Sequence, residues 1–353
     1  SLKRKAPMAK IRTGQRIGIL TAGGDCPGIN AAIRGVSKTA IVNYNMTVIG
    51  ISDGFTGMIN KEYRELNEHD LSGILTMGGT ILGTSREKPF KSNGKGKNDL
   101  KKPALIREHY EQLGLDCLVC IGGNGTLKTA YLLSQEGLNV VGIPKTIDND
   151  VWGTDLTFGF DSAVNIATEA IDRLHSTANS HKRIMIIELM GHNAGWIALY
   201  SGLAGGGDVI LIPEIKYYEK KVAEYLMSRF RENKAYSIMV VAEGIRTPEK
   251  DISPAQYLSK KIPELTGIET RETVLGYIQR GGTPSPMDRV LATRYGAAAA
   301  DLIAKGSYGK MVALNNNMIT SVPLSEVAGK LKLVDPLNPM VIQAKNMGTS
   351  FGD

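Results

Sequence analysis

The sequence predicts an α/β fold built on mainly parallel β-sheets, and two observations support this prediction. Apolar, strand-like runs alternate along the chain with segments whose apolar residues recur at helical spacing. Several of the apolar runs end in glycine-rich or Asp-Gly turns. Strands that are apolar on both faces are typical of parallel sheets covered by helices. Because right-handed crossovers bring the carboxyl ends of such strands to one edge, we expect ligands to bind there.

The strands and helices are expected in a regular order. A first strand at residues 17–20 leads into a Gly-Gly-Asp turn and a helix with Ala31, Ala32, Val36 and Ala40 at helical spacing. Further strands are expected in TVIGISDGF, CLVCIGG, NVVGIP (which ends at Pro144), RIMIIELMGHNAG, DVILIPEI and YSIMVVAEGI. Further helices are expected in NGTLKTAYLL, SAVNIATEAIDRLHSTAN and KVAEYLMSRFRENK.

Length and composition are those of an ordinary globular protein. The 353 residues suggest two domains with a packed core, and 42% of them are hydrophobic and 22% charged. No segment approaches the roughly 18 consecutive apolar residues that a membrane span needs. Residues 1–15 lack the apolar core of a signal peptide. We therefore expect a cytoplasmic protein with no membrane partner.

The three cysteines are not expected to form a redox site. Cys117 and Cys120 have C-x-x-C spacing, but they lie in the apolar strand LDCLVCIGG, where a packing role is the better interpretation. An odd number of cysteines without a secretory signal favours a reducing compartment.

The net charge of +7 fits either nucleic acid or phosphorylated small molecules as partners. The basic residues are dispersed and few aromatic residues lie among them, so we do not expect nucleic acid binding. The segment KPFKSNGKGKNDLKKP, residues 88–103, is rich in lysine and glycine. A solvated loop is its plainer interpretation, and a flap over an anionic ligand is the alternative.

Two glycine-rich turns predict a phosphate site. The segments TAGGDCPGINAAIRG (residues 21–35) and IGGNGT (residues 121–126) each connect a strand to a helix. Glycines let the backbone approach a phosphate, and the helix that follows offers N–H groups and a partial positive charge. One such turn would be weak evidence, but two at one sheet edge predict that at least one binds a phosphate. The P-loop pattern G-x-x-x-x-G-K-[ST] is not present.

The segment PKTIDND, residues 144–150, carries the strongest chemical signal. In an extended segment the carboxylates of Asp148 and Asp150 would point the same way. Such a pair is repulsive unless it serves a cation or a proton transfer. Lys145 adds a charge that can neutralise a phosphate. Without further context, an Asx-rich turn is an equally good interpretation of this segment.

Other polar residues follow or flank the predicted strands. Arg280 precedes two glycines, which leave a guanidinium room to reach a phosphate, and Glu243 ends a buried strand, where a carboxylate is costly without a ligand. His192 could donate to a phosphate, although a structural or solvated role is commoner for a lone histidine. The histidines show no metal-ligand spacing and no nucleophile elbow is present, so covalent catalysis has no support.

Taken in order, these segments resemble the phosphofructokinase family of the Gly-Gly-Asp-Gly type. The resemblance extends from about Ile17 to about Ile303. It rests on GILTAGGDCPGINAAIRG, IGGNGT, PKTIDND, TFGFDSAV, MGHNAGW, ILIPE, VVAEGI and VLGYIQRGGTPSPMDRVLATRYG. The resemblance implies two similar Rossmann-like lobes with the active site in the cleft between them, and a homo-oligomer, either dimer or tetramer.

The resemblance also implies a division of the chain. Residues 1–150, joined by part of 275–325, would form the phosphoryl-donor lobe. Residues 151–274 would form the sugar-phosphate lobe, and 326–353 would be a C-terminal tail that packs on the lobes.

The implied reaction is transfer of a phosphoryl group to the 1-hydroxyl of fructose 6-phosphate, with Mg²⁺ as cofactor. Asp148 would be the base, and Asp150, Thr146 and Lys145 would complete the catalytic group. The implied metal ligands are Asn124 and Asp150. The implied substrate residues are Arg183 (from the same or a neighbouring subunit), Met190, Gly191, His192, Glu243, Arg271, Tyr277 and Arg280, and the implied donor residues are Gly24, Arg86, Gly123, Asn124, Gly125 and Thr126.

Three residues depart from the usual family pattern. The family usually has aspartate in place of Asn124 and often arginine in place of His192, and its best-known bacterial members have histidine in place of Tyr277. An asparagine keeps a carbonyl oxygen for magnesium but loses a charge, so the sequence predicts a weaker protein contribution to metal binding.

The phosphoryl donor is predicted from two positions. Gly125 leaves room for the α-phosphate of ATP, whereas pyrophosphate-using relatives tend to have aspartate there. Lys145 is more typical of the pyrophosphate-using relatives, but a lysine excludes no donor. We therefore expect ATP, with pyrophosphate as the alternative. A non-catalytic sensor that binds the same ligands and a kinase for a related sugar phosphate are the other hypotheses, motivated by Asn124 and His192.

Overall fold

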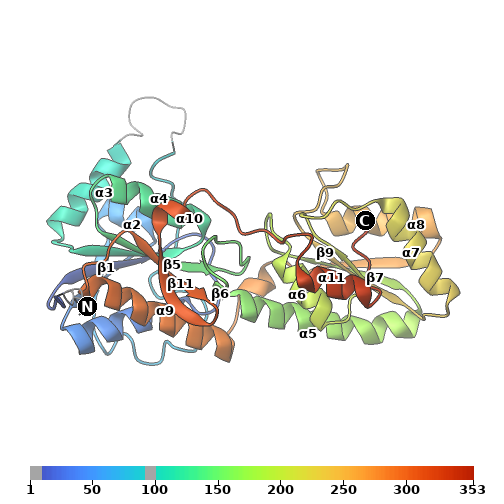
Figure 1. Ribbon diagram of the computed structural model, residues 1–353, viewed down its shortest axis with the longest axis horizontal. Coiled ribbons are helices and arrows are strands. Elements are labelled where there is room, and N and C mark those ends of the chain that lie inside the picture. The colour runs from blue at the N-terminus through green and yellow to red at the C-terminus, as the bar shows by residue number, and fades with distance from the viewer. Residues whose placement is uncertain (1–9, 92–100) are drawn as a thin grey trace, which may run out of the picture. The chain divides into compact units, whose positions relative to one another are not determined.

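The computed structural model describes residues 10–91 and 101–353, and this part of the chain forms two compact units (Figure 1). Unit 1 contains the described residues up to Thr146 together with Val151–Phe158 and Gly282–Lys330. Unit 2 contains Ile147–Asp150, Gly159–Gly281 and Leu331–Asp353. Each unit has a sheet covered by helices, so the predicted α/β class is confirmed.

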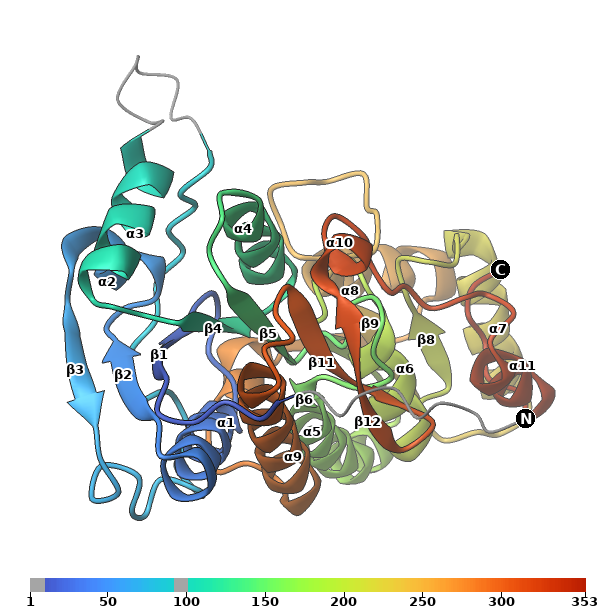
Figure 2. The same ribbon diagram turned by 60° about the vertical axis from the view of Figure 1, so that its left-hand side comes forward.

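Unit 1 is built on an eight-stranded, mainly parallel sheet with the strand order β12-β11-β5-β4-β1-β2-β3 and with β6 paired to β5 (Figure 2). The central strands β2, β1, β4, β5 and β11 are parallel, and the edge strands β3 and β12 are antiparallel to their neighbours. The strands are β1 (Arg16–Thr21), β2 (Thr47–Ile51), β3 (Tyr63–Leu66), β4 (Cys117–Gly122), β5 (Val140–Thr146), β6 (Phe158–Gly159), β11 (Lys310–Asn315) and β12 (Met318–Pro323).

Helices cover both faces of this sheet, as its buried strands require. On one face α1 packs against α9 so closely that a Cβ atom on Gly35 would come within 2.8 Å of the Thr293 carbonyl oxygen. On the other face α2, α3 and α4 pack on the strands through a core that includes Phe55, Ile106 and Leu127. The helices are α1 (Ile29–Lys38), the π-helical η1 (Thr39–Asn43), α2 (Phe55–Asn60), α3 (Lys101–Gln112), α4 (Asn124–Gln135), α9 (Pro286–Ala304) and α10 (Leu324–Val327).

Unit 2 is built on a four-stranded parallel sheet with the order β10-β7-β9-β8. Every residue of the central strands β7 and β9 is buried, which is the pattern that the apolar runs predicted. The strands are β7 (Ile184–Leu189), β8 (Val209–Leu211), β9 (Ser237–Ala242) and β10 (Thr270–Val274), and the helices are α5 (Phe160–His181), α6 (Trp196–Ala204), α7 (Glu219–Arg231), α8 (Pro254–Thr266), the 3₁₀-helical η2 (Gly276–Arg280) and α11 (Pro339–Asn346).

The last residues of the chain pack on unit 2. Phe351 is buried, and Ser350 pairs with Val209 of β8 through an isolated parallel bridge. The Tyr225 hydroxyl on α7 donates a hydrogen bond to the carbonyl oxygen of Gly348. The C-terminal segment is therefore part of the folded unit.

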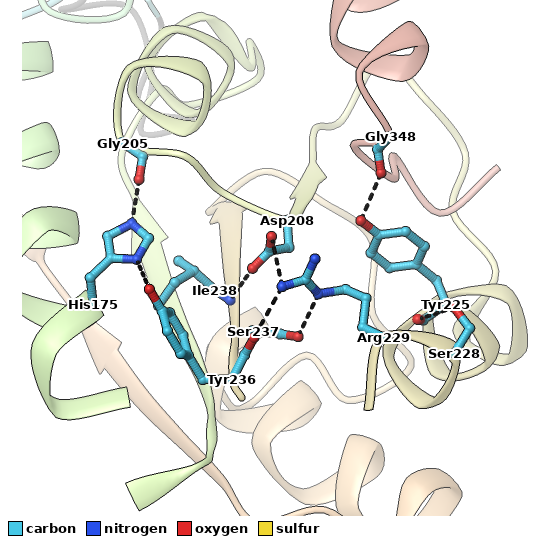
Figure 3. A network of polar contacts seen from close by, with 10 residues as sticks. All are labelled: His175, Gly205, Asp208, Tyr225, Ser228, Arg229, Tyr236, Ser237, Ile238 and Gly348. Carbon is cyan, nitrogen blue, oxygen red and sulfur yellow. Dashed lines mark hydrogen bonds and ion pairs between the residues drawn. The ribbon is translucent and has the colours of Figure 1, made fainter. Parts of the chain in front are cut away.

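A polar network ties α7 to the sheet of unit 2 (Figure 3). The Arg229 guanidinium contacts the Asp208 carboxylate at 3.1 Å and donates to the Ser237 hydroxyl at 2.9 Å. The other Asp208 oxygen accepts the N–H of Ile238 at 2.9 Å. His175 bonds the Tyr236 hydroxyl through its Nδ1 atom at 2.8 Å. Burial raises the pKa of the Asp208 carboxyl, and the Arg229 charge opposes that rise.

The structure corrects one predicted strand end. The fourth predicted strand does not end at Pro144, because β5 continues to Thr146. Pro144 lies beyond Val141 and Gly142, the two residues of β5 that pair with β11. Pro144 has no N–H to donate, but the ladder with β4 still reaches it, where it is in register with Gly122.

Several other predictions concern particular segments. Cys117 and Cys120 are buried in β4 and form no disulfide, and burial raises the pKa of both thiols, which opposes redox chemistry. This confirms the packing interpretation. Within the predicted loop 88–103, residues 92–100 lie outside the described part of the chain, and 101–103 begin α3. Among the described helices, none combines the length and the apolar character that crossing a bilayer requires.

Candidate functional site

The two glycine-rich turns of unit 1 lie side by side at the carboxyl edge of its sheet. They follow β1 and β4, which are adjacent and parallel, and Thr21 is in register with Ile121. The N–H of Ala22 donates to the Ile121 carbonyl oxygen at 3.1 Å. A Cβ atom on Gly23 would lie only 3.9 Å from the Thr126 hydroxyl oxygen. The structure therefore brings together the turns that the sequence predicted to form a phosphate site.

Arg86 follows a segment that is hydrogen-bonded to the first turn. The N–H of Gly23 donates to the Ser85 carbonyl oxygen at 3.0 Å, and the Thr84 hydroxyl donates to the Gly23 carbonyl oxygen at 2.6 Å. Gly23 has a φ of 81°, a conformation that favours glycine. Arg86 is exposed, so the structure places a solvent-accessible cation next in sequence to this contact.

Helix α4 begins at Asn124, directly after its N-cap residue Gly123. A glycine has no side chain, so this N-cap residue makes no side-chain hydrogen bond to the helix. The first turn of the helix therefore keeps the partial positive charge of an N-terminus. A Cβ atom on Gly122 would come within 2.3 Å of Thr126, so this glycine is required by the turn itself. At Gly125 a Cβ atom would meet no heavy atom within 4 Å, so the space beside this residue is open.

Lys145 connects the end of β5 to the first glycine-rich turn. Its side chain is buried, and its ammonium group donates to the carbonyl oxygen of Gly24. A Cβ atom on Gly23 would lie 3.6 Å from the same ammonium nitrogen. Because lysine is almost never buried without partners, this placement indicates a site organised around its charge.

The predicted acid pair lies in a turn at the end of β5. Of the two interpretations of this segment, the structure favours the Asx-rich turn over the extended segment, because Asn149 has a φ of 53° and residues 147–148 form a turn. Asn149 and Asp150 are buried, whereas Asp148 is half-buried. The two carboxylates still interact, but through the turn and not through strand alternation. The half-buried carboxylate of Asp148 is therefore accessible to an incoming ligand, whereas the buried carboxylate of Asp150 is less so.

The environment of Asp150 favours its neutral form. Burial raises the pKa of this carboxyl to about 6, and the neighbouring charge of Asp148 adds to the rise. The charges of His192 and Lys332 act in the opposite direction. A cation that approached Asp150 would therefore stabilise the charged form that burial disfavours.

The two candidate metal ligands, Asn124 and Asp150, each suit a magnesium ion that takes most of its ligands from phosphates and water. The described residues include no cluster of three His, Cys, Asp or Glu side chains that could hold a metal ion on their own. Asp150 offers a carboxylate and Asn124 a carbonyl oxygen, and both are the hard oxygen ligands that magnesium prefers. Each suits an ion whose remaining ligands are phosphates and water.

In unit 2 a loop after β7 is held by two polar side chains. One oxygen of Glu243 accepts the N–H groups of Gly191 at 3.2 Å and His192 at 2.8 Å. The N–H of Met190 donates to the side-chain oxygen of Gln279, at 3.2 Å. Gly191 has a φ of 143°, and a Cβ atom there would come within 2.4 Å of the Ala194 carbonyl oxygen. The predicted residues Met190, Gly191, His192 and Glu243 therefore form one structural group.

Helix η2 joins the same group. Gln279 is fully buried, and besides its bond to Met190 it donates to the Gly276 carbonyl oxygen at 3.0 Å. The Arg280 guanidinium lies 5.2 Å from the centre of the Tyr277 ring. Tyr277 is 76% exposed, so this face of η2 is available to a ligand or to another molecule.

Arg183 and Arg271 lie at the opposite end of the unit 2 sheet. Arg183 directly precedes β7 and Arg271 is near the start of β10, and both contact Glu269, at 3.1 and 2.7 Å. Met190 directly follows β7, and the strand between it and Arg183 spans about 23 Å at ~3.3 Å per residue. The structure therefore does not bring these two arginines to the group around Glu243.

Two residues near the site escaped the sequence prediction. Gln279 supports the loop after β7, and Lys332 of the C-terminal segment contacts Asn149, with its ammonium nitrogen 3.2 Å from the side-chain oxygen. Gln279 could have been suspected because it lies between the predicted residues Tyr277 and Arg280 in the segment YIQR. For Lys332 no local signal exists, because it is far from Asn149 in the sequence.

Comparison with known proteins agrees with this geometry. Residues 16–303 match the phosphofructokinase family. The chain is 61% identical to ATP-dependent 6-phosphofructokinase 3 of Bacteroides thetaiotaomicron over 96% of this chain and all of that protein. It is 57% identical to the ATP-dependent 6-phosphofructokinase of Spirochaeta thermophila, with 95% and 97% covered. It is also 46% identical to the pyrophosphate–fructose 6-phosphate 1-phosphotransferase of Streptomyces coelicolor, with 91% and 96% covered.

The fold agrees as well. The phosphofructokinase structure from Saccharomyces cerevisiae superposes with a TM-score of 0.77 at 31% identity, over 89% of this chain. The chain spans less than half of that longer yeast chain, since only 44% of it is covered. The match over residues 16–303 and the identity to full-length relatives confirm the resemblance inferred from the sequence: the chain belongs to the phosphofructokinase family.

Proposed function

We propose that this chain is an ATP-dependent 6-phosphofructokinase, which transfers the γ-phosphoryl group of ATP to the 1-hydroxyl of fructose 6-phosphate. One observation carries the proposal. The ammonium group of Lys145 is bonded to the first glycine-rich turn, and the acid pair follows this lysine within five residues of chain. A phosphate cradle and candidate proton acceptors are thus joined by one short segment, as phosphoryl transfer to a hydroxyl requires.

The two units supply different groups in this proposal. In unit 1, ATP binds to Gly24, Arg86 and the turn 123–126, where N–H groups and the N-terminus of α4 favour phosphate. In unit 2, the sugar phosphate binds to Met190, Gly191, His192, Glu243, Tyr277 and Arg280. The Glu243 oxygen that holds the loop after β7 is already engaged, so the sugar meets the remaining oxygen of this carboxylate.

The proposed chemistry is an in-line displacement. The half-buried carboxylate of Asp148 accepts the proton of the attacking hydroxyl, while Thr146 orients the sugar phosphate. The charge that develops on the transferred group is stabilised by Lys145 and by N–H groups of the glycine-rich turns. Asn124 of unit 1 and Asp150 of unit 2 are the candidate ligands for Mg²⁺, which would supply further charge neutralisation when bound.

ATP is preferred over pyrophosphate because of the open space at Gly125. No heavy atom lies within 4 Å of a Cβ position there, so the protein leaves room for an additional phosphate and the nucleoside attached to it. A pyrophosphate-dependent enzyme remains the second candidate, since one relative at 46% identity has that name and since Lys145 is compatible with either donor.

Arg183 and Arg271 need a separate explanation because they lie far from Glu243 within unit 2. We propose that they serve the sugar phosphate of a neighbouring copy of the chain in a homo-oligomer. Their shared partner Glu269 holds both guanidinium groups at one end of the sheet, where a second molecule can reach them. An anion that binds there would compete with Glu269 for these charges.

A coupled assay with fructose 6-phosphate, Mg²⁺ and either ATP or pyrophosphate tests the proposal. We expect product formation with ATP, and a fall in kcat of about 10²–10⁴-fold in Asp148→Asn, the usual contribution of a general base. Ser72→Asn, an exposed substitution in unit 1, serves as the control. Binding of both substrates without turnover would indicate a non-catalytic sensor and refute the proposal, and turnover with pyrophosphate alone would reverse the donor assignment.

A further inference from the structure

The C-terminal segment after unit 1 passes directly beside the acidic turn. The N–H of Lys332 donates to the Asp150 carbonyl oxygen at 2.9 Å, and the Lys332 carbonyl oxygen accepts the indole N–H of Trp196 at 2.9 Å. Two residues later, the N–H of Val334 donates to a carboxylate oxygen of Glu214 at 2.8 Å. All of these contacts lie within unit 2. The backbone of the segment is therefore fixed by its own hydrogen bonds.

The side chain of Lys332 makes contacts that this anchoring does not require. Its ammonium nitrogen lies 3.2 Å from the side-chain oxygen of Asn149 and 5.4 Å from the centre of the Trp196 ring. Both neighbours attract a cation, one through a hydrogen bond and the other through its π electrons. The half-buried lysine side chain is thereby held over the turn.

Asn149 is the residue whose orientation matters most in this turn. It lies between the two acids, it is 2% exposed, and its backbone has a left-handed φ of 53°. In this conformation the directions of the Asp148 and Asp150 side chains depend on how the Asn149 peptide is fixed. A cation that bonds the Asn149 side chain restricts this turn and also offsets the two negative charges beside it.

We propose that Lys332 is a positioning residue for phosphoryl transfer, which holds the turn 148–150 in the orientation that the base Asp148 needs. Lys332 does not touch the substrates in this proposal and acts through Asn149. The kinetic part of the inference rests on the proposed function, but the effect of Lys332 on the turn does not.

The test compares three variants of the full-length chain: Lys332→Met, Lys332→Arg and the control Lys330→Met. Lys330 lies two residues earlier and also stands over an aromatic ring, with its ammonium 5.9 Å from the centre of Trp152, and both of these residues belong to unit 1, whereas the turn belongs to unit 2. Hydrogen–deuterium exchange of a peptide covering residues 146–151 reports on the turn directly, and the coupled ATP assay reports on its use.

We expect exchange in this peptide to become about tenfold faster in Lys332→Met, because a hydrogen bond to a charged group has been lost. We expect kcat to fall about tenfold or more, with the KM values for ATP and fructose 6-phosphate changed less than about threefold. Lys332→Arg should recover most of both losses, and Lys330→Met should leave both quantities unchanged.

Each other outcome decides the question. Unchanged exchange in Lys332→Met would overturn the inference whether or not the chain is a kinase. Faster exchange with normal kcat in an active enzyme would show that Lys332 is merely structural. A raised KM at constant kcat would show that it contacts a substrate, which also contradicts the proposal. If the unaltered chain transfers no phosphoryl group, the proposed function fails separately, and faster exchange then still supports the effect of Lys332 on the turn.

Discussion

The substitution Gly125→Asp tests the choice of phosphoryl donor with little risk to the fold. Gly125 is the second residue of α4, it is exposed, and its φ lies outside the left-handed region. A Cβ atom there would meet no heavy atom within 4 Å. Replacing a helical glycine with aspartate favours the helix by only about 0.3 kcal/mol, and an acidic residue in the first turn adds roughly 0.3–1 kcal/mol. We therefore expect an unchanged or slightly raised Tm.

The effect on ATP follows from Coulomb's law. If the proposed α-phosphate site places the new carboxylate about 4 Å from the phosphate, the repulsion costs about 4 kcal/mol at the effective dielectric constant of roughly 20 that suits a protein surface. Because ~1.4 kcal/mol corresponds to a factor of ten, kcat/KM for ATP should fall about 10³-fold. The KM for fructose 6-phosphate should change little, since the sugar residues are assigned to another unit.

The assay compares kcat/KM for ATP in Gly125→Asp, Gly125→Asn and Gly125→Ala. The asparagine variant has nearly the same shape as aspartate without its charge, and the alanine variant adds only a methyl group in open space. Most of the loss should appear only with aspartate. If Gly125→Asp kept ATP turnover within a few-fold of the unaltered chain, the phosphate would not pass beside this residue. Equal losses with asparagine and aspartate would assign the effect to shape and contradict the electrostatic calculation.

Three further predictions concern charge. Arg229→Met should lower the free energy of unfolding by about 2 kcal/mol in urea titrations, because it leaves the largely buried Asp208 carboxylate without its cation. The control Arg173→Met breaks the exposed ion pair with Glu169 and should change the free energy of unfolding by under about 0.5 kcal/mol. Equal losses in the two variants would contradict this reasoning. Burial raises the pKa of Glu188 above its ordinary 4.5, so between these two pKa values the folded protein holds a proton that the unfolded chain has lost. The contribution of Glu188 to stability therefore falls as pH rises from about 4.5 through the raised pKa. Glu188→Gln should be more stable relative to the unaltered chain at pH 7 than at pH 4. Asn124→Asp should lower the Mg²⁺ concentration for half-maximal rate about fivefold, as ~1 kcal/mol from a solvated charge pair implies, and an unchanged titration would remove Asn124 from the metal site.

The sequence was sufficient for the strands and the turns because their signals are local. The apolar runs at β1, β4, β7 and β9 and the glycines 122, 123 and 125 each fit the structure for reasons contained within a few residues. Adjacent parallel strands then bring the two glycine-rich turns together, as the rule for carboxyl ends predicts. The same rule also separates Arg183 from Met190, because these residues flank opposite ends of β7, and the sequence already contained that information.

The errors arose where local structure depends on distant contacts. The sequence left residues 147–150 open between an extended segment and an Asx-rich turn, and the structure shows the turn, in which Asn149 takes a left-handed φ and its side chain is bonded to the distant Lys332. Pro144 does not end β5, because the strand continues beside β4 with Pro144 in register with Gly122, and this pairing depends on a strand outside the segment. Periodicity and spacing within a segment contain no information on such contacts.

The acidic turn also explains how an asparagine can stand where the family usually has aspartate. Two carboxylates this close need counter-charges, and the chain supplies one itself: the charge of Lys332 acts on Asp150, and its ammonium is bonded to Asn149. Lys145, three residues before Asp148, adds a second cation near the phosphate turns. Under the proposed function, magnesium would not be the sole neutralising charge for these acids and would be bound chiefly through the phosphates of its nucleotide. The carboxylate lost at Asn124 would then weaken metal binding without removing the proposed base Asp148.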